Sequence, residues 1–395
     1  MKTDFVFIDQ NVDPDRISKK CTLRQGCKIL GERTFICDEA ELGFEAPVTV
    51  NNCYIGPGVS LKGGYFENAV FLEGASAGSG AHVRGGTIME EQSSLAHTVG
   101  VKQTILMPFV TLGSLINFCD CLMAGGTSRH NHSEVGSSYI HFNYTPNQDK
   151  ATASLIGDVP SGVMLNQNPI FLGGQGGLVG PCRITFGTVI AAGSVYRKDQ
   201  LQPDRLVFSG AGRGGSVPYN TGVYGNVKRQ ALNNLIYMAN LVALMVWYRL
   251  VRRQFIGEQF PPQLYDGLVG TLKIAIDERI KRFMAFCKKL ETSKKLYNER
   301  MGEKTSASLV RQKTELIENR LRFENLMDNC LRNCGLFENK SFLSAIGKKI
   351  DESGLNYLCV IQGLDQKETE MGTKWLQKIV DEMLCKMIEL YPSLR

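Results

Sequence analysis

Histidines are the most informative residues of this chain. All five lie between His82 and His141, and three lie within the twelve residues from His130 to His141. Imidazole is the usual general base at neutral pH, and nearby Arg and Lys side chains suit a phosphate or a nucleotide. The polar residues around these histidines are Arg129, Glu134, Asn143, Tyr144 and Lys150.

Three interpretations of this histidine-rich segment stay open. The residues act in catalysis on a small substrate, they hydrogen-bond within loops or a subunit interface, or they bind a metal. A metal-dependent β-helix resembling a carbonic anhydrase would use His97, His130, His132 or His141. Apart from Glu134, no carboxylate or Cys lies nearby at a spacing typical of a metal site, so we expect no bound metal.

The composition divides the chain into two parts. Residues 1–225 hold 17 Lys+Arg and 19 Asp+Glu, a net charge of −2, with 32 of the 41 glycines. Residues 226–395 hold 28 Lys+Arg and 20 Asp+Glu, a net charge of +8. Basic and acidic residues are interleaved in the second part, which favours a solvated helical surface over a nucleic-acid-binding one. We therefore expect two domains and no nucleic-acid partner.

A six-residue repeat predicts the fold of the first part. Thirteen of the fifteen positions taken every sixth residue from Leu23 to Met107 are apolar, and the exceptions, Glu41 and Pro47, precede Leu42 and Val48. This period fits neither an amphipathic helix nor an alternating strand, but it is typical of a parallel β-helix. The pattern weakens after about residue 107, so we expect a loop insertion over about 108–150.

The second part, 226–395, is predicted to be an α-helical domain. Ile276, Ile280 and Phe283 continue into Cys287 and Leu290 on one helical face. The apolar stretch from Leu235 to Val251 is short for a membrane span. It predicts a helix buried between subunits or domains, and the alternative is a helix lying in a membrane interface. The helical domain is therefore a candidate for peripheral membrane or protein contact.

The first part resembles the hexapeptide-repeat, left-handed β-helix proteins, which are mostly acyltransferases. Residues 128–136, SRHNHSEVG, and 141–158, HFNYTPNQDKATASLIGD, carry a closer resemblance. They are similar to the acetyltransferase domain of the bifunctional N-acetylglucosamine-1-phosphate uridyltransferase/glucosamine-1-phosphate acetyltransferase family. That family's uridyltransferase domain has no counterpart in this chain. The resemblance implies a left-handed β-helix and a homotrimer.

The same resemblance implies roles for particular residues. His132 matches the catalytic base, with Glu134 or His130 to orient it. Asn143 and Tyr144 match the pair that holds the sugar and the acyl donor, Lys150 matches the lysine of that segment, and Arg129 joins them in binding substrate. TVIAAGSVYRKD at 188–199 matches the repeat along which the pantetheine arm lies. The residues predicted to contact acetyl-CoA are Gly174, Gly176, Ala192 and Arg213, the last of these in a glycine-rich anion nest.

These observations predict coenzyme A-dependent acetyl transfer to a sugar phosphate or a sugar nucleotide related to UDP-N-acetylglucosamine. The alternative is a non-catalytic sugar-nucleotide-binding or scaffold protein. The spacing from His132 to Asn143 favours this alternative, because it is shorter than the family's by about two hexapeptides. The twelve Cys without a disulfide pattern, and charges where a signal peptide would be apolar, predict a cytoplasmic protein.

Overall fold

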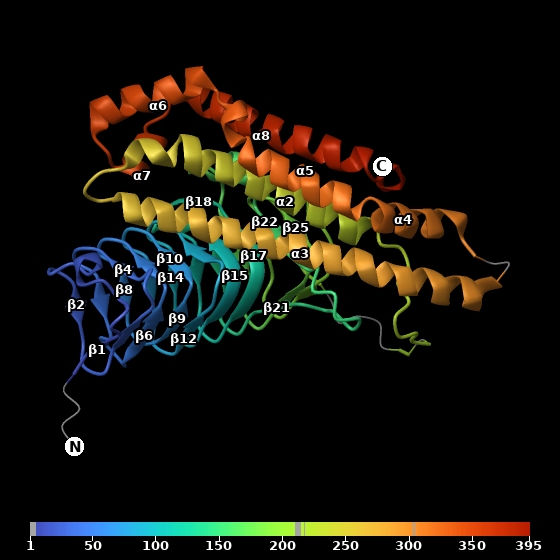
Figure 1. The fold of residues 1–395 in the computed structure, drawn as a ribbon, viewed down its shortest axis with the longest axis horizontal. Helices are drawn as coiled ribbons and strands as arrows, with labels where there is room; N and C mark the ends of the chain where they lie inside the picture. The colour runs from blue at the N-terminus through green and yellow to red at the C-terminus, as the bar shows by residue number, and fades with distance from the viewer. Residues whose placement is uncertain (1–4, 210–214, 217, 303–304) are drawn as a thin grey trace.

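The computed structural model describes residues 5–209, 215–216, 218–302 and 305–395. Its first part is a parallel β-helix, in which short strands follow one another around three faces and stack from turn to turn (Figure 1). Two sheets of 16 and 10 strands make up the three faces.

The first face and the second face belong to the same sheet, because β15 and β17 bend from one onto the other. The first face consists of β1 (Phe7–Ile8), β3 (Lys28–Leu30), β6 (Val48–Asn51), β9 (Gly64–Glu67), β12 (Ala81–Val83), β15 (Gly100–Leu106), β17 (Asn117–Met123), β21 (Ile140–Phe142), β24 (Gly177–Val179) and β27 (Val195–Tyr196). The second face adds β4 (Phe35–Ile36), β7 (Tyr54–Ile55), β10 (Ala69–Phe71), β13 (Thr87–Met89), β22 (Ser154–Ile156) and β25 (Arg183–Ile184).

The third face is the 10-stranded sheet. Its strands are β2 (Thr22–Leu23), β5 (Glu41–Leu42), β8 (Ser60–Leu61), β11 (Ser76–Ala77), β14 (Ser94–Leu95), β16 (Thr111–Leu112), β20 (Glu134–Val135), β23 (Phe171–Leu172), β26 (Val189–Ile190) and β28 (Leu206–Val207). The second residue of most of these strands points into the core, and Leu42, Leu61 and Leu112 have no exposed surface. Leu42, not Glu41, fills the inner position, as the shift in the repeat indicated.

Helices form the rest of the described chain. They are α2 (Lys228–Leu250), α3 (Pro262–Met301), α4 (Ala307–Glu318), α5 (Arg320–Arg332), α6 (Lys340–Ser353), α7 (Tyr357–Gln362) and α8 (Gln366–Glu389). The short helix α1 (Val159–Gly162) lies between β22 and β23 in the chain and contacts α2 and α8. Short 3₁₀ turns occur at Pro14–Arg16, Arg252–Phe255, Cys334–Phe337 and Pro392–Leu394. These elements confirm the predicted fold class, a parallel β-helix followed by an α-helical part.

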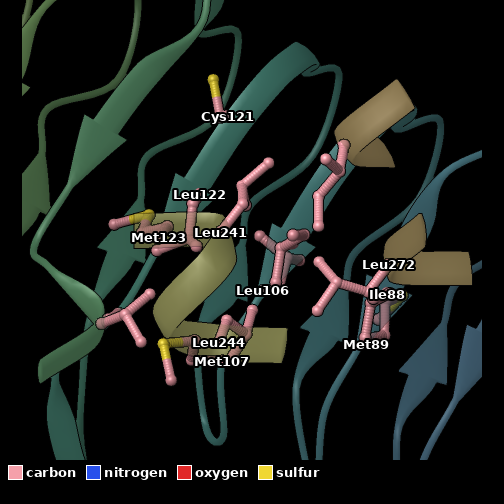
Figure 2. Packing of buried hydrophobic residues seen from close by; sticks show 14 of the residues in the cluster. Ile88, Met89, Leu106, Met107, Cys121, Leu122, Met123, Leu241, Leu244 and Leu272 are labelled. Carbon is pink, nitrogen blue, oxygen red and sulfur yellow. The ribbon is translucent and has the colours of Figure 1, made fainter. Parts of the chain in front are cut away.

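Helices α2 and α3 lie side by side along the β-helix and cover its second face (Figure 1). Strands of this face are apolar on both sides, so that Ile88 and its inward neighbour Met89 are both fully buried. Figure 2 shows Ile88 beside Leu272 of α3, and Leu241 of α2 beside strand β17. Gly267 allows α3 to approach closely, because a Cβ there would lie 2.3 Å from the Tyr54 ring. The two parts of the chain therefore share one core.

Helix α2 is the one helix in the described part of the chain that is long and apolar enough to cross a membrane. Most of its apolar window, 83%, is buried inside this structure. Its surroundings are the second face of the β-helix on one side and α3 and α8 on others. The structure thus accounts for the apolar stretch at Leu235–Val251 by burial between the two parts of the chain.

The predicted loop insertion over 108–150 differs from the structure. Strands β16, β17, β20 and β21 keep the turns in register across most of this range. Two excursions leave the turns: a hairpin of β18 (Gly126–Ser128) and β19 (Asn131–His132), and the loop 143–153. The repeat is hidden in the sequence because the hairpin breaks the spacing and because His141, not an aliphatic residue, fills an inward position.

Candidate functional site

His132 and Glu134 lie together at the base of the β18–β19 hairpin. His132 ends β19 and Glu134 begins β20, and their Nε2 and Oε2 atoms are 3.7 Å apart. The His132 side chain is 19% exposed and that of Glu134 is 42% exposed. The Nδ1 atom of His132 is buried without a hydrogen-bond partner among the described residues. A half-buried imidazole next to a carboxylate is an arrangement that can serve a general base.

Arg129 and His130 occupy the turn of the same hairpin, and His130 is exposed. The Arg129 guanidinium donates to the carbonyl oxygens of Gln92 at 2.8 Å and Phe109 at 3.2 Å. It also contacts the hydroxyls of Ser94 and Thr111, at 3.3 and 3.0 Å. Arg129 therefore ties the hairpin to two lower turns, and these contacts compete with its predicted role in binding substrate.

Asn143, Tyr144 and Lys150 lie on the loop 143–153, between β21 and β22. The amide nitrogen of Asn143 donates to Asp120 Oδ2 at 2.9 Å, and Thr152 Oγ1 donates to Asn143 Oδ1 at 2.7 Å. Tyr144 is 66% exposed. The loop is anchored through buried Asp149, which accepts from the Tyr224 hydroxyl at 3.0 Å and from Gln230 Nε2 of α2 at 3.2 Å.

A cavity of about 370 Å³ lies between this loop, the first face of the β-helix and α3. Its lining includes Asn143 and Lys150 from the predicted site, but not Tyr144. The charged residues that line it are Arg84, Lys102, Asp120, Lys150, Glu278, Arg279 and Arg282. We call it the basic pocket, because five of these side chains are cationic and two are anionic.

The cations of the basic pocket fall into two groups. Arg279 is paired with Asp120, and Arg282 is paired with Glu278. Among the described residues, Arg84, Lys102 and Lys150 have no carboxylate partner; the Arg84 guanidinium contacts only the Cys119 sulfur, at 3.7 Å. Three positive charges are therefore left over, and a cavity with this surplus attracts anions such as phosphate groups.

His141 also lines the basic pocket, but its ring points into the β-helix core. It packs against the Phe118 ring, with centroids 6.1 Å apart, and its Nε2 shares a hydrogen bond of 2.7 Å with Ser154 Oγ. Burial lowers the pKa of His141 to about 4. His141 is therefore neutral at pH 7 and occupied in the core.

Arg84 and Lys102 are pocket residues that the sequence interpretation missed. They lie one position after the inward residues Val83 and Val101, which pair directly in β12 and β15. Their spacing of 18 residues, one full turn of three hexapeptides, was the available signal. That spacing places two cations on the same face of adjacent turns.

Three of the residues predicted to contact acetyl-CoA lie where the chain passes from the third face to the first face, at one of the three corners of the β-helix. Gly174 and Ala192 belong to the connections from the third face to the first face, and Gly176 is buried there. A Cβ at Gly176 would lie 2.8 Å from the carbonyl oxygens of Gly173 and Ser194, so turn stacking alone requires this glycine. Arg213 lies outside the described residues.

The structure distributes the predicted site over all three corners of the β-helix. The His132 hairpin leaves between the second and third faces, and the loop 143–153 leaves between the first and second faces. The Gly174 connection runs between the third and first faces. One chain therefore brings His132 together with Glu134, and Asn143 with Lys150, but does not join these pairs.

The histidines considered for a metal site are also separated. His97 Nδ1 contacts the Ser114 hydroxyl at 2.9 Å, and His141 is in the core. Within the described ranges, no group of three or more His, Cys, Asp or Glu side chains is arranged to hold a metal ion.

Comparison with known proteins agrees with this class of fold, a β-helix of hexapeptide repeats like that of acetyltransferases. The chain is similar to proteins described as "Bifunctional protein GlmU". The one from Nocardia farcinica (strain IFM 10152) is 28% identical over 195 residues, which is 49% of this chain and 35% of the relative. The one from Geotalea uraniireducens (strain Rf4) is 26% identical over 210 residues, which is 52% of this chain and 40% of the relative.

This chain thus spans two fifths or less of the length of these relatives. No protein-family model matches it. Among solved structures, LpxA from Acinetobacter baumannii is 13% identical and covers 68% of this chain, with a TM-score of 0.24. The similarity to GlmU confirms the resemblance noted in the first half of the sequence.

Proposed function

We propose that this protein transfers an acyl group, most simply acetyl from acetyl-CoA, to an amino or hydroxyl group of a sugar phosphate or sugar nucleotide related to UDP-N-acetylglucosamine. The observation that carries the proposal is the basic pocket, in which Asn143 and Lys150 share a cavity with Arg84 and Lys102. Three unpaired cations suit a phosphate group, and Asn143 is exposed at the same place. The similarity to GlmU supports acyl transfer as the class of reaction.

In this proposal, His132 is the general base. Its imidazole takes a proton from the acceptor as the acceptor's nitrogen or oxygen attacks the thioester carbonyl. The C–S bond then breaks, and the proton passes to the departing coenzyme A sulfur. Glu134, whose Oε2 lies 3.7 Å from His132 Nε2, orients the imidazole.

The proposal also requires more than one chain. His132, the basic pocket and the Gly174 connection lie at different corners, so a complete site combines corners of neighbouring protomers. A homotrimer meets this requirement, because a closed three-fold ring places one surface of each chain against a different surface of its neighbour. Trimer formation is part of the proposal.

Turnover tests the proposal. Purified protein is incubated with acetyl-CoA and a panel of amino-sugar phosphates and UDP-sugars, and products are read by mass spectrometry, since the protein's own Cys would react with a thiol dye. We expect an acetylated product with the wild type and a loss of at least ~100-fold with His132→Ala. Unchanged turnover in His132→Ala would contradict the assigned base.

A sugar-nucleotide-binding or scaffold protein is the second candidate function. It is favoured by the separation of His132 from the basic pocket within one chain and by the contacts that occupy Arg129. It predicts saturable binding of a UDP-sugar with no product from any member of the panel. That result would replace the acyltransferase proposal.

A further inference from the structure

We infer that Arg279, in the helical part of the chain, is a positioning residue for Asn143 and acts through Asp120. The inference rests on the proposed function, because it concerns the basic pocket. It makes helix α3 a working part of that pocket rather than only a cover for the β-helix.

Three side chains form the connection from α3 to Asn143. Arg279 donates from Nη2 to Asp120 Oδ1 at 2.5 Å, and the two side chains are only 4% and 12% exposed. The other oxygen of Asp120 accepts from Asn143 Nδ2 at 2.9 Å. Asp120 therefore uses one oxygen for the helix and the other for the pocket.

These contacts fix the amide of Asn143. Its oxygen accepts from Thr152, and one of its two N–H groups is given to Asp120. A side-chain amide has two N–H donors, so one N–H of Asn143 remains for a ligand oxygen. The amide does not rotate to present its oxygen instead, because both Thr152 and Asp120 would lose their hydrogen bonds.

Arg279 holds the Asp120 carboxylate in the orientation that faces Asn143. A nearly buried carboxylate needs a paired cation, and Arg279 is the cation in contact with it. Without Arg279, the buried carboxylate of Asp120 lacks its cation and turns toward water. Asp120 Oδ2 then moves away from Asn143 Nδ2, and the amide loses the partner that orients it.

The helix supplies a matched control. Arg282 lies three residues further along α3, lines the same pocket and is likewise paired with a carboxylate, that of Glu278. Arg282 pairs with Glu278 and, in the described part of the chain, forms no hydrogen bond or ion pair with Asp120. Loss of Arg282 removes an equal charge from the pocket wall but leaves the Asp120–Asn143 hydrogen bond intact.

The test compares Arg279→Met with Arg282→Met in the full chain, using glucosamine 1-phosphate as the probe in isothermal titration calorimetry. We expect Arg279→Met to weaken binding about ten-fold, and Arg282→Met less than about three-fold. Adding Asp120→Asn to Arg279→Met removes the uncompensated carboxylate and restores an acceptor for Asn143, so binding should recover at least about three-fold. Equal losses in the two arginine variants, or a further loss in the double variant, would overturn the inference.

A measurement without ligand separates this inference from the proposed function. If the wild type does not bind the probe, the proposed phosphate site is wrong, and the unfolding equilibrium still tests Arg279. Arg279→Met and Asn143→Ala are combined in a double-mutant cycle by urea unfolding. We expect the effects on the unfolding constant to depart from multiplicativity by at least about three-fold, and to become multiplicative once Asp120→Asn is present. If the two effects are multiplicative while Asp120 is still native, the positioning role is refuted.

Discussion

Single residues of this protein acquire their properties from one or two neighbours. Lys150 and Lys102 keep an uncompensated charge because no carboxylate in the described part of the chain pairs with them. Arg129, in contrast, donates hydrogen bonds to the carbonyl oxygens of Gln92 and Phe109. His132 and His141 also differ because of their neighbours. His132 is half-buried beside Glu134, and His141 is fixed in the core with a lowered pKa. These differences select the residues to test.

Lys150→Gln should weaken phosphate binding at the basic pocket. A charge-assisted hydrogen bond to a phosphate is worth about 1.5–3 kcal/mol, so we expect a loss in affinity of about ten-fold or more for glucosamine 1-phosphate. The salt dependence of binding should fall as well, because one cation fewer is present. Lys19→Gln, at an exposed position far from the pocket in the first turns, is the control and should leave both quantities unchanged.

Glu90→Gln should stabilise the protein increasingly as pH rises. Glu90 is buried, next to Glu91, and accepts a hydrogen bond from the Tyr248 hydroxyl. Burial raises its pKa from the ordinary 4.5 to about 7. Between these values the unfolded chain ionises Glu90 while the folded chain holds it neutral, so the wild type loses stability as pH rises.

Glutamine does not titrate, so the variant escapes this loss. Its unfolding free energy should exceed that of the wild type by an amount that grows from pH 4.5 to 7 and levels off near ~3 kcal/mol. Urea unfolding at a series of pH values measures the difference. Glu32→Gln, at an exposed position, should show no such slope. A pH-independent difference for Glu90→Gln would contradict the raised pKa.

At the scale of elements, helices α2 and α3 are bound to the second face of the β-helix by apolar and ionic contacts. Arg252, which follows α2, is fully buried against Glu91 and stacks on the Tyr357 ring, 3.7 Å from its centroid. Separating this buried ion pair would leave a charge buried without its partner, which strongly destabilises a fold. The contact therefore holds the helices in one position on the β-helix. The same position sets α3 against the basic pocket.

Leu272→Ala tests the apolar part of this packing. Leu272 of α3 is fully buried, near Ile88 of β13 in Figure 2. Deleting a buried leucine side chain costs about 2–5 kcal/mol, and we expect a loss in this range in urea unfolding. Ile274→Ala, two residues away on the same helix and 37% exposed, should cost less than about 1.5 kcal/mol. Equal losses would contradict the packing of α3 against the β-helix.

The sequence predicts elements better than it predicts their contacts. The six-residue repeat indicates the β-helix, and the shift at Glu41 locates Leu42 as the inner residue, because inward positions must be apolar. The turns at 108–142 escape prediction, since His141 replaces an aliphatic residue and the hairpin 126–132 alters the spacing. The contact of Arg279 with Asp120 could not be predicted either, because the two residues are 159 positions apart and local sequence patterns do not report such a contact.

For the whole molecule, the important feature is the arrangement of three corners. The His132 hairpin, the basic pocket and the connection at Gly174 lie at different edges of one β-helix, and the helices cover the second face. We therefore expect a homotrimer in which corners of neighbouring chains complete each site. Native mass spectrometry should give three times the chain mass of 43.8 kDa. A monomer with full turnover would contradict this arrangement.

Subunit complementation tests the central claim most directly. His132→Ala and Lys150→Ala chains, each with low turnover alone at an acceptor concentration below saturation, are co-expressed with different tags, and mixed assemblies are purified through both tags. If His132 of one chain serves the basic pocket of its neighbour, one of the three sites in every mixed trimer contains both native residues, and turnover returns to about a third of the wild-type value. Turnover that stays as low as in the separate variants would show that the two residues do not meet across protomers.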